Sequence, residues 1–262
     1  MNWLRKLSEN RLLFKCLEKE RHRVFPIGHV EADDIFIASY PKSGNTWFRQ
    51  LTAACAYGLL PQFSPTPLYG LVVPDTHQEA LYVRFAKTMY FKTHALPSPD
   101  FRKTVYLLRD GRDVMVSYHH WLQQVYRQEF TLRDMVTKGT GLFPCQWHTH
   151  VSAWMENPFQ SNLLLIKYED LLENPVSQLR RFCEFAGLQR DDAFLTLVAE
   201  SASFHNMEKH NSTVKECLPG EPATHPIRRR GQAGCWREEM PPEIQDLFMA
   251  AAGPVMKSCA YA

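Results

Sequence analysis

Short apolar runs alternate with longer stretches of helical periodicity along most of this chain. Runs of about four to eight apolar residues bounded by polar or turn-forming residues are typical of buried strands. Such runs occupy residues 35–39, 88–92, 104–108 and 163–167. Apolar residues recur at helical spacing near residues 45–58, 111–126, 147–156 and 175–186. Strands that alternate with helices predict an α/β fold with a central, mostly parallel sheet flanked by helices.

Two stretches interrupt the alternation. Residues 57–87 carry prolines among aromatic residues and predict an irregular excursion. Residues 205–230 are polar and contain further prolines, and they predict a long loop. Loops of that length in a compact domain are usually functional or mobile.

The N-terminal stretch combines apolar and basic positions. Residues 1–25 predict a helix, within a helical extension over residues 1–30. A basic amphipathic helix can lie on an anionic membrane surface. Glu9, Glu18 and Glu20 dilute the basic face, and charged faces are usually just solvated. We therefore expect a helix docked on the domain rather than a peripheral membrane contact.

Composition places the chain among single-domain globular proteins. Its 262 residues, 45% of them hydrophobic, suffice for one large core, so we expect one domain over residues 1–262. The net charge of +2 is too small to attract nucleic acid by bulk electrostatics. We therefore expect no nucleic-acid partner, and any anion site must be local.

The cysteines and the hydropathy of the chain indicate its cellular compartment. The seven cysteines are odd in number, scattered and without a Cys-x-x-Cys pair. Reduced thiols in the cytoplasm explain this pattern better than a disulfide framework or a zinc site. No apolar run approaches the ~18 residues of a membrane span, and no signal-peptide core is evident. The sequence thus predicts a soluble cytoplasmic protein.

The strand predicted at residues 35–39 leads into a helix through a short polar loop. Residues 40–47 read Tyr-Pro-Lys-Ser-Gly-Asn-Thr-Trp. Backbone N–H groups at a helix start, the helix dipole and a nearby ammonium form a site for a phosphate-like anion. The loop is not the usual P-loop, because Lys42 precedes the only glycine, Gly44. The alternative is an ordinary turn with a solvent-facing lysine.

Polar residues follow all four predicted strands. In an open parallel sheet, ligands bind beyond the carboxyl ends of the strands. Here those ends carry Lys42 and Ser43, Lys92 to His94, Arg109, and Tyr168 with Glu169. A second basic cluster, residues 228–230, precedes Gly231. Local positive charge in a nearly neutral chain predicts a ligand with more than one anionic group.

Several of these segments resemble, in the same order, the cytosolic sulfotransferases, which use 3′-phosphoadenosine 5′-phosphosulfate (PAPS). Residues 40–47 resemble the family's 5′-phosphosulfate loop, Y-P-K-S-G-T-T-W, with Asn45 in place of threonine. Residues 91–97 resemble the K-[TS]-H-L-P segment with one inserted residue. Residues 108–118 are similar to R-N-x-K-D-x-x-V-S-Y, and residues 229–236 to R-K-G-x-x-G-D-W. The resemblance covers about residues 33–237 and implies a P-loop-like sulfotransferase fold.

Further landmarks of the family lie at residues 147–154, 167–175 and 203–207. Two further positions depart from its pattern, with Cys235 in place of aspartate and Ala202 in place of a frequent threonine. The family's dimerisation pattern is not preserved after Trp236. The resemblance therefore implies nothing about the oligomeric state.

The resemblance also implies roles. His94 would be the general base, Lys42 would contact the bridging oxygen of the donor, and Lys92 would stabilise the sulfonate oxygens. Ser117 would complete the catalytic set. Backbone and side chains of Ser43, Gly44, Asn45 and Thr46 would hold the 5′-phosphate. The remaining residues would bind the 3′-phosphate or the adenine: Arg109, Ser117, Arg229, Arg230 and Gly231 for the phosphate, and Trp47, Tyr168, Ser203 and Phe204 on the adenine side. The loop over residues 205–230 would close over the cofactor and acceptor.

Transfer from PAPS would leave adenosine 3′,5′-bisphosphate (PAP) and needs no metal. The expected acceptor is a hydroxyl on a small, partly apolar molecule, because the stretches expected to surround it are rich in aromatics and histidine. His148 and His150 alone make a poor metal site. A P-loop nucleotide kinase would need a lysine after a second glycine and a carboxylate for magnesium. A non-catalytic nucleotide-binding regulator is the other alternative, but it would need a broken His94 or Lys42.

Overall fold

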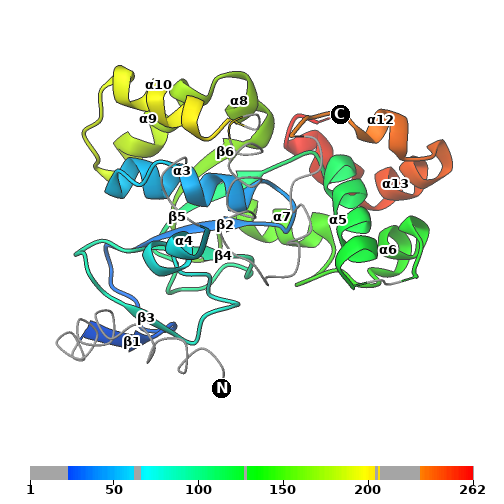
Figure 1. Cartoon of the computed structure of the whole chain (residues 1–262). Helices are drawn as coiled ribbons and strands as arrows, with labels where there is room; N and C mark the ends of the chain where they lie inside the picture. Colours follow the sequence, from blue (N-terminus) through cyan, green and yellow to red (C-terminus); the bar gives the residue numbers. More distant parts are fainter. Residues whose placement is uncertain (1–22, 62–65, 127–128, 204–205, 207–230, 262) are drawn as a thin grey trace, which may run out of the picture.

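A four-stranded parallel sheet forms the centre of the computed structural model, which describes residues 23–61, 66–126, 129–203, 206 and 231–261 (Figure 1). The strand order is β4-β2-β5-β6, and each neighbouring pair is parallel. The strands are β2 (Ile35–Ser39), β4 (Tyr90–Thr93), β5 (Lys103–Leu108) and β6 (Asn162–Lys167). These are the four predicted strands, shifted by at most two residues at their first residue.

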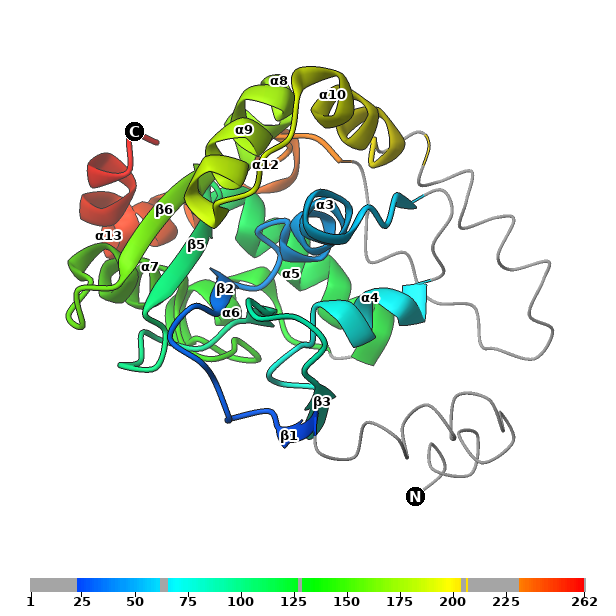
Figure 2. The same ribbon diagram turned by 90° about the vertical axis from the view of Figure 1, so that its left-hand side faces the viewer.

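Helices cover both faces of the sheet, as Figures 1 and 2 show from two directions. One face carries α3 (Asn45–Tyr57), α4 (Thr66–Val72), α8 (Tyr168–Glu173), α9 (Pro175–Ala186) and α10 (Asp192–Ser201). The other carries α5 (Gly111–Tyr126), α6 (Leu132–Lys138), α7 (Trp147–Glu156), α12 (Trp236–Glu239) and α13 (Pro242–Ser258). The predicted helices correspond to α3, α5, α7 and α9.

The alternation of side chains along the strands explains the two layers. Ile35 and Ile37 of β2 pack with α3 and α9 in one hydrophobic cluster, whereas Phe36 and Ala38 point to the other face. Because helices cover both faces, β2 is buried along its whole length. A central parallel strand therefore reads as a continuous apolar run, the pattern from which it was predicted.

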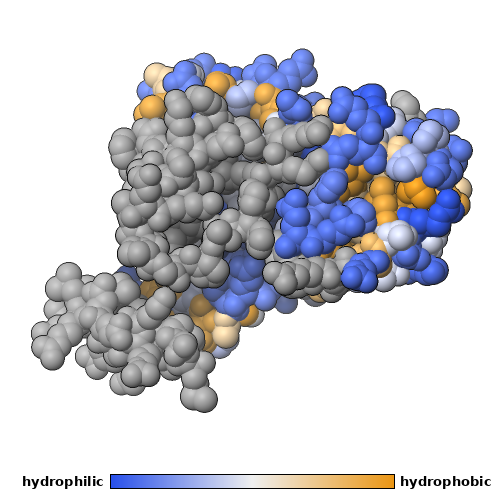
Figure 3. Space-filling model, turned by 45° about the vertical axis from the view of Figure 1, so that its right-hand side comes forward, coloured by the Kyte–Doolittle hydropathy of each residue, from blue (hydrophilic) through white to orange (hydrophobic). Residues whose placement is uncertain are grey.

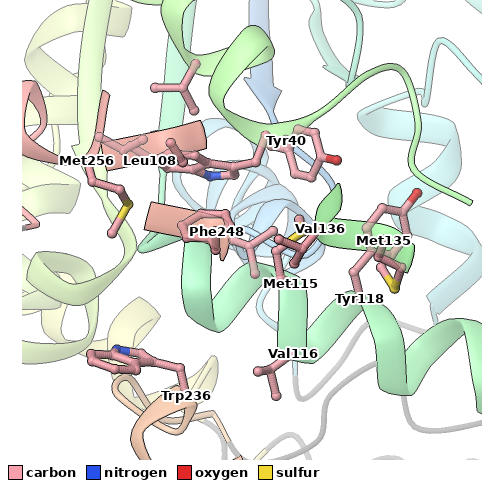
Figure 4. Close-up of a cluster of buried hydrophobic side chains, with 14 of the residues drawn as sticks. Tyr40, Leu108, Met115, Val116, Tyr118, Met135, Val136, Trp236, Phe248 and Met256 are labelled. Carbon is pink, nitrogen blue, oxygen red and sulfur yellow. The ribbon is translucent and has the colours of Figure 1, made fainter. Parts of the chain in front are cut away.

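The second cluster joins α5, α6, α7 and α13 to the face of the sheet that carries Ala38, Tyr106 and Leu108. Figure 4 shows Met115, Val136 and Phe248 meeting at its centre. Gly111, the first residue of α5, lies against this cluster, and a Cβ there would come within 2.6 Å of Phe248 Cζ. The start of α5 thus approaches the aromatic core closely, which sets the position of Arg109 just before it.

The N-terminal prediction is wrong where it can be compared. Residues 1–22 lie outside the described residues, but Val24–Pro26 form β1, which pairs antiparallel with β3 (Leu81–Val83). A β-branched residue and an aromatic residue next to a proline suit a short strand better than a helix. The predicted irregular excursion over residues 57–87 therefore contains β3 as well as α4.

The described surface in Figure 3 is mostly hydrophilic, with smaller apolar areas between the charged residues. Within the described ranges, no helix has both the length and the apolar character needed to cross a lipid bilayer.

Candidate active site

The loop between β2 and α3 takes a left-handed turn at Lys42 (φ 69°) and again at Gly44 (φ 91°). The second turn favours glycine on steric grounds alone. A Cβ at Gly44 would also lie 2.6 Å from Cδ2 of Tyr168, so the loop and the start of α8 are in close contact. The single glycine of the loop motif is therefore required by both backbone conformation and packing.

The N-terminus of α3 has no side-chain cap, and its N-cap residue is Gly44. The first N–H groups of a helix have no intrahelical partner and attract anions. Ser43 is 2% exposed, and its buried Oγ has no hydrogen-bond partner within the described residues. The start of α3 thus offers backbone donors and a hydroxyl for an anion.

Two cations gather at this loop, Lys42 on the loop itself and Arg109 beside it. Arg109, at the carboxyl end of β5, donates from Nη1 to the Lys42 carbonyl at 3.0 Å and lies 4.4 Å over the Tyr168 ring. The Lys42 ammonium lies 5.2 Å over the Trp121 ring. Burial, with smaller effects from Arg109 and Lys92, lowers the pKa of Lys42 to about 8. An anion bound here would reverse that effect, because it favours the charged ammonium.

His94 follows β4 and is fixed in one tautomer. Its Nδ1 lies 2.8 Å from the carbonyl oxygen of Ser39. A carbonyl can only accept, so Nδ1 carries the proton and Nε2 of the neutral ring has its lone pair available. Burial, and then the charge of Lys92, lower the pKa of His94 to about 3. The imidazole is therefore neutral at pH 7 and able to accept a proton at Nε2.

Lys92 has a partner that the sequence motifs do not reveal. Its Nζ lies 2.6 Å from Oδ2 of Asp75, and both residues are more than nine-tenths buried. Backbone bonds from Lys92 N to Pro74 O and from Thr76 N to Lys92 O bring Asp75 beside β4. Burial, the largest single influence, pushes the pKa of Asp75 up, but the charge and hydrogen bond of Lys92, helped by the His77 N–H, keep it below its ordinary value.

The sequence gives one indirect signal for Asp75. Residues 75–77, Asp-Thr-His, form a polar triplet immediately after Pro74, within a proline- and aromatic-rich stretch. The third residue of the triplet also reaches the base, because His94 N donates to Nε2 of His77 at 2.9 Å. No local sequence pattern predicts the pairing with Lys92, because an isolated parallel β-bridge between Asp75 and Lys92, outside the named strands, brings the two residues together.

Asn45 corrects one expectation. We expected its side-chain amide to hold the 5′-phosphate, but Asn45 is 3% exposed and its Nδ2 lies within hydrogen-bond distance of three oxygens of the chain itself. Its backbone N–H remains at the start of α3. The amide is directed into the sheet because the helix begins directly above the carboxyl ends of β2 and β4.

The region expected to bind the 3′-phosphate is described in part. Arg109 Nη2 donates to Gln232 O at 3.1 Å, and Asp113 accepts from the N–H groups of Gly234 and Trp236 at 2.6 and 2.9 Å. The segment that begins at Gly231 is thereby held against the start of α5, on which Ser117 lies one turn further along. Arg229, Arg230, Phe204 and nearly all of the long loop lie outside the described residues.

The residues expected on the adenine side lie near the start of α3. Trp47 donates from Nε1 to Ala202 O at 2.8 Å and meets the Tyr168 ring edge-on at 5.9 Å between centroids. Ser203 follows Ala202 directly. The structure therefore brings together Lys42 to Trp47, Lys92, His94, Arg109 and Tyr168 at the carboxyl edge of the sheet, with Ser203 adjoining.

His150 is occupied by internal hydrogen bonds. Its Nδ1 accepts from the Tyr106 hydroxyl at 2.9 Å, and its Nε2 donates to the carbonyls of His94 and Ala95 at 3.2 Å. With both ring nitrogens in use, His150 supports the backbone of the base rather than pairing with His148.

We expect the stability of the ligand-free chain to fall as pH decreases below about 6.5. Burial lowers the pKa of His94 to about 3 and that of His150 to about 4. The ordinary value near 6.5 holds in the unfolded chain, which therefore binds more protons in this range. The stability is present in full above about pH 6.5 and is lost by up to about 1.4 kcal/mol per pH unit for each histidine.

Urea unfolding at several pH values between about 5 and 7.5 measures this loss. The His94→Ala variant is the control, because its stability should depend less steeply on pH than that of the wild type. Equal slopes for the two chains would show that His94 keeps an ordinary pKa.

The parallel sheet, with a polar loop between β2 and the start of α3 at its carboxyl edge, defines a P-loop-like α/β fold, the class predicted from the sequence. The sulfotransferase domain profile matches residues 32–260, and the chain belongs to the sulfotransferase family. This match confirms the predicted family and the prediction that the chain is a sulfotransferase.

Relatives and solved structures agree with the family. Sulfotransferase 1A1 of Bos taurus is 28% identical over 260 residues, covering 89% of this chain and 88% of the relative. Sulfotransferase 1 family member D1 of Mus musculus is 26% identical over 232 residues, covering 79% and 78%. The fold is shared with a mouse sulfotransferase complexed with PAP (TM-score 0.65, 23% identity, 89% and 90% covered). It is also shared with retinol dehydratase in complex with androsterone and PAP (TM-score 0.64, 22% identity, 87% and 82% covered).

Proposed function

We propose that the chain transfers the sulfonate group of PAPS to a hydroxyl of a small, partly apolar molecule, with His94 as the general base. The observation that carries this proposal is the arrangement at one sheet edge of an anion loop, two lysines and an imidazole whose Nε2 lone pair is available. The PAP named in the two similar structures supports PAPS as the donor. The androsterone and retinol named in similar structures support a partly apolar acceptor.

The reaction is an in-line displacement at sulfur. The acceptor oxygen forms the new S–O bond as the bond to the bridging phosphate oxygen breaks, and PAP leaves with the electron pair. Nε2 of His94 takes the acceptor proton. Lys42 offsets the charge that develops on the leaving phosphate, and Lys92 stabilises the sulfonate oxygens; both act electrostatically. Binding of the anionic donor should raise the pKa of His94 towards the range useful for a base, because it counters the nearby lysines.

The 3′-phosphate gives this proposal its first test. We expect PAP to bind about 10- to 100-fold more tightly than AMP, since Arg109 adds a charge-assisted contact worth about 1.5–3 kcal/mol. Thermal-shift titrations with PAP, AMP and ATP measure the difference, and an acceptor screen with labelled PAPS follows. Equal affinity for AMP and PAP, or magnesium-dependent ATP hydrolysis, would overturn the assignment and favour a kinase.

Strand β5 supplies a matched pair of variants for that titration. Arg109 follows the carboxyl end of the strand, whereas the exposed Arg102 precedes its amino end, at the opposite edge of the sheet. Arg109→Gln should abolish most of the preference for PAP over AMP, and Arg102→Gln should leave it unchanged. Unfolding of both variants without ligand shows whether the loss is one of binding or of stability.

A further inference from the structure

Asn45 links the two strands from which the donor loop and the base emerge. Its Nδ2 lies 3.1 Å from Ile37 O and 2.9 Å from Ser39 Oγ, both on β2. It also lies 3.2 Å from Thr93 O at the end of β4. One side chain on the first turn of α3 therefore contacts the carboxyl ends of both neighbouring strands.

The chemistry of this amide argues against a contact with the donor. An amide nitrogen has two hydrogens, and here three oxygens already surround it. The other polar atom, Oδ1, is buried and can only accept a hydrogen bond, so a phosphate oxygen facing it would be repelled. The backbone N–H of Asn45 is then the only group of this residue suited to an anion.

The oxygens that Asn45 contacts belong to the residues that hold the base. Ser39 accepts the Nδ1 proton of His94 at its carbonyl (2.8 Å), and its Oγ is 3.4 Å from the same nitrogen. Thr93 directly precedes His94 in the chain. Losing the amide would leave Ser39 Oγ without its donor and would free the end of β4 from β2 and α3.

We propose that Asn45 is a positioning residue, whose side chain holds the imidazole of His94 at the acceptor while only its backbone takes part in donor binding. This inference rests on the proposed function, because it assigns Asn45 to the base rather than to the phosphate. Threonine, the residue of the related motif, has one hydroxyl hydrogen and cannot serve two strands at once.

Steady-state kinetics separate the two roles. Asn45→Ala and Asn45→Thr should each lower kcat about 10- to 100-fold, because a base displaced by about 1 Å loses reactivity steeply. The Kd for PAP, measured by calorimetry, should stay within about 3-fold of the wild-type value. A kcat close to wild type together with a 10-fold weaker affinity for PAP would instead make the amide a phosphate ligand and overturn the proposal.

A spectroscopic measurement tests the inference without turnover. In ¹⁵N-histidine spectra, the His94 signals, assigned by their absence in His94→Ala, should show the Nδ1–H tautomer in the wild type. Asn45→Ala should populate both tautomers. An unchanged tautomer in that variant would reject the positioning role, whatever the outcome of the acceptor screen.

The Ser39→Ala variant tests the same link without changing Asn45. This change removes only the hydroxyl that Asn45 donates to and leaves the carbonyl that fixes His94. It should lower kcat in the same direction, by about 3- to 10-fold, at unchanged affinity for PAP. If Asn45→Ala fails to fold, this variant decides, and a wild-type kcat in it would contradict the link.

Discussion

Replacement of His94 by alanine is expected to lower kcat about 100-fold while the affinity for PAP stays within about 3-fold of the wild-type value. The reason is the geometry of the ring. Nδ1 is committed to Ser39 O, so Nε2 is the one nitrogen able to remove the acceptor proton. The anion loop and Arg109 are built from other residues, so donor binding should survive the change.

Single-turnover assays with labelled PAPS, together with calorimetry with PAP, measure the two quantities. His29→Ala is the control, because His29 is an exposed histidine beside β1, away from the carboxyl edge of the sheet. It should behave as the wild type in both assays. Wild-type turnover of His94→Ala would remove this residue from the mechanism, and a parallel loss of PAP binding would point to collapse of the site.

The regular part of the fold could be predicted because its signals are local. The strands β2, β4, β5 and β6 are short apolar runs, fully or almost fully buried in β2, β4 and β5, and α5 and α9 carry clear helical periodicity. The strand β1 could not be predicted in the same way. Its pairing with β3 is a contact between residues more than 50 positions apart, such as Phe25 and Tyr82, and a three-residue strand has no periodicity of its own.

Some features of the candidate site could likewise be predicted from the sequence, and others could not. Lys42, His94 and Arg109 follow strands whose carboxyl ends must meet at one edge, so their proximity could be expected from topology. The direction of the Asn45 side chain and the identity of the partner of Lys92 could not, because both depend on tertiary packing at the end of β4. Motif letters indicate which residues gather at the site, but not which ones face the ligand.

Asp75→Ala should be the most destabilising change near the site, lowering the free energy of unfolding by about 3–5 kcal/mol. The variant leaves the ammonium of Lys92, which is 8% exposed, without the carboxylate 2.6 Å away. An uncompensated buried charge accounts for that cost, and it is a large share of the about 5–15 kcal/mol that stabilises an ordinary domain. Turnover should fall as well, because the proposed role of Lys92 at the sulfonate depends on the position of its ammonium.

A double variant tests whether the unpaired charge of Lys92 causes the loss of stability. Asp75→Ala combined with Lys92→Met removes both charges and should recover much of the lost stability, because an apolar side chain tolerates burial. Turnover should stay low, since methionine offers the sulfonate oxygens no positive charge. Urea unfolding and turnover, measured on the single and double variants, give the coupling between the two residues.

The exposed pair of Asp33 and Lys87 provides the comparison for this cycle. The two charges are 2.9 Å apart, but their side chains are 56% and 88% exposed, so water screens them. Asp33→Ala should therefore leave stability and turnover nearly unchanged. If Asp75→Ala were equally harmless, Lys92 would have to find solvent or another partner, and Asp75 would play no part in holding the ammonium of Lys92 in place.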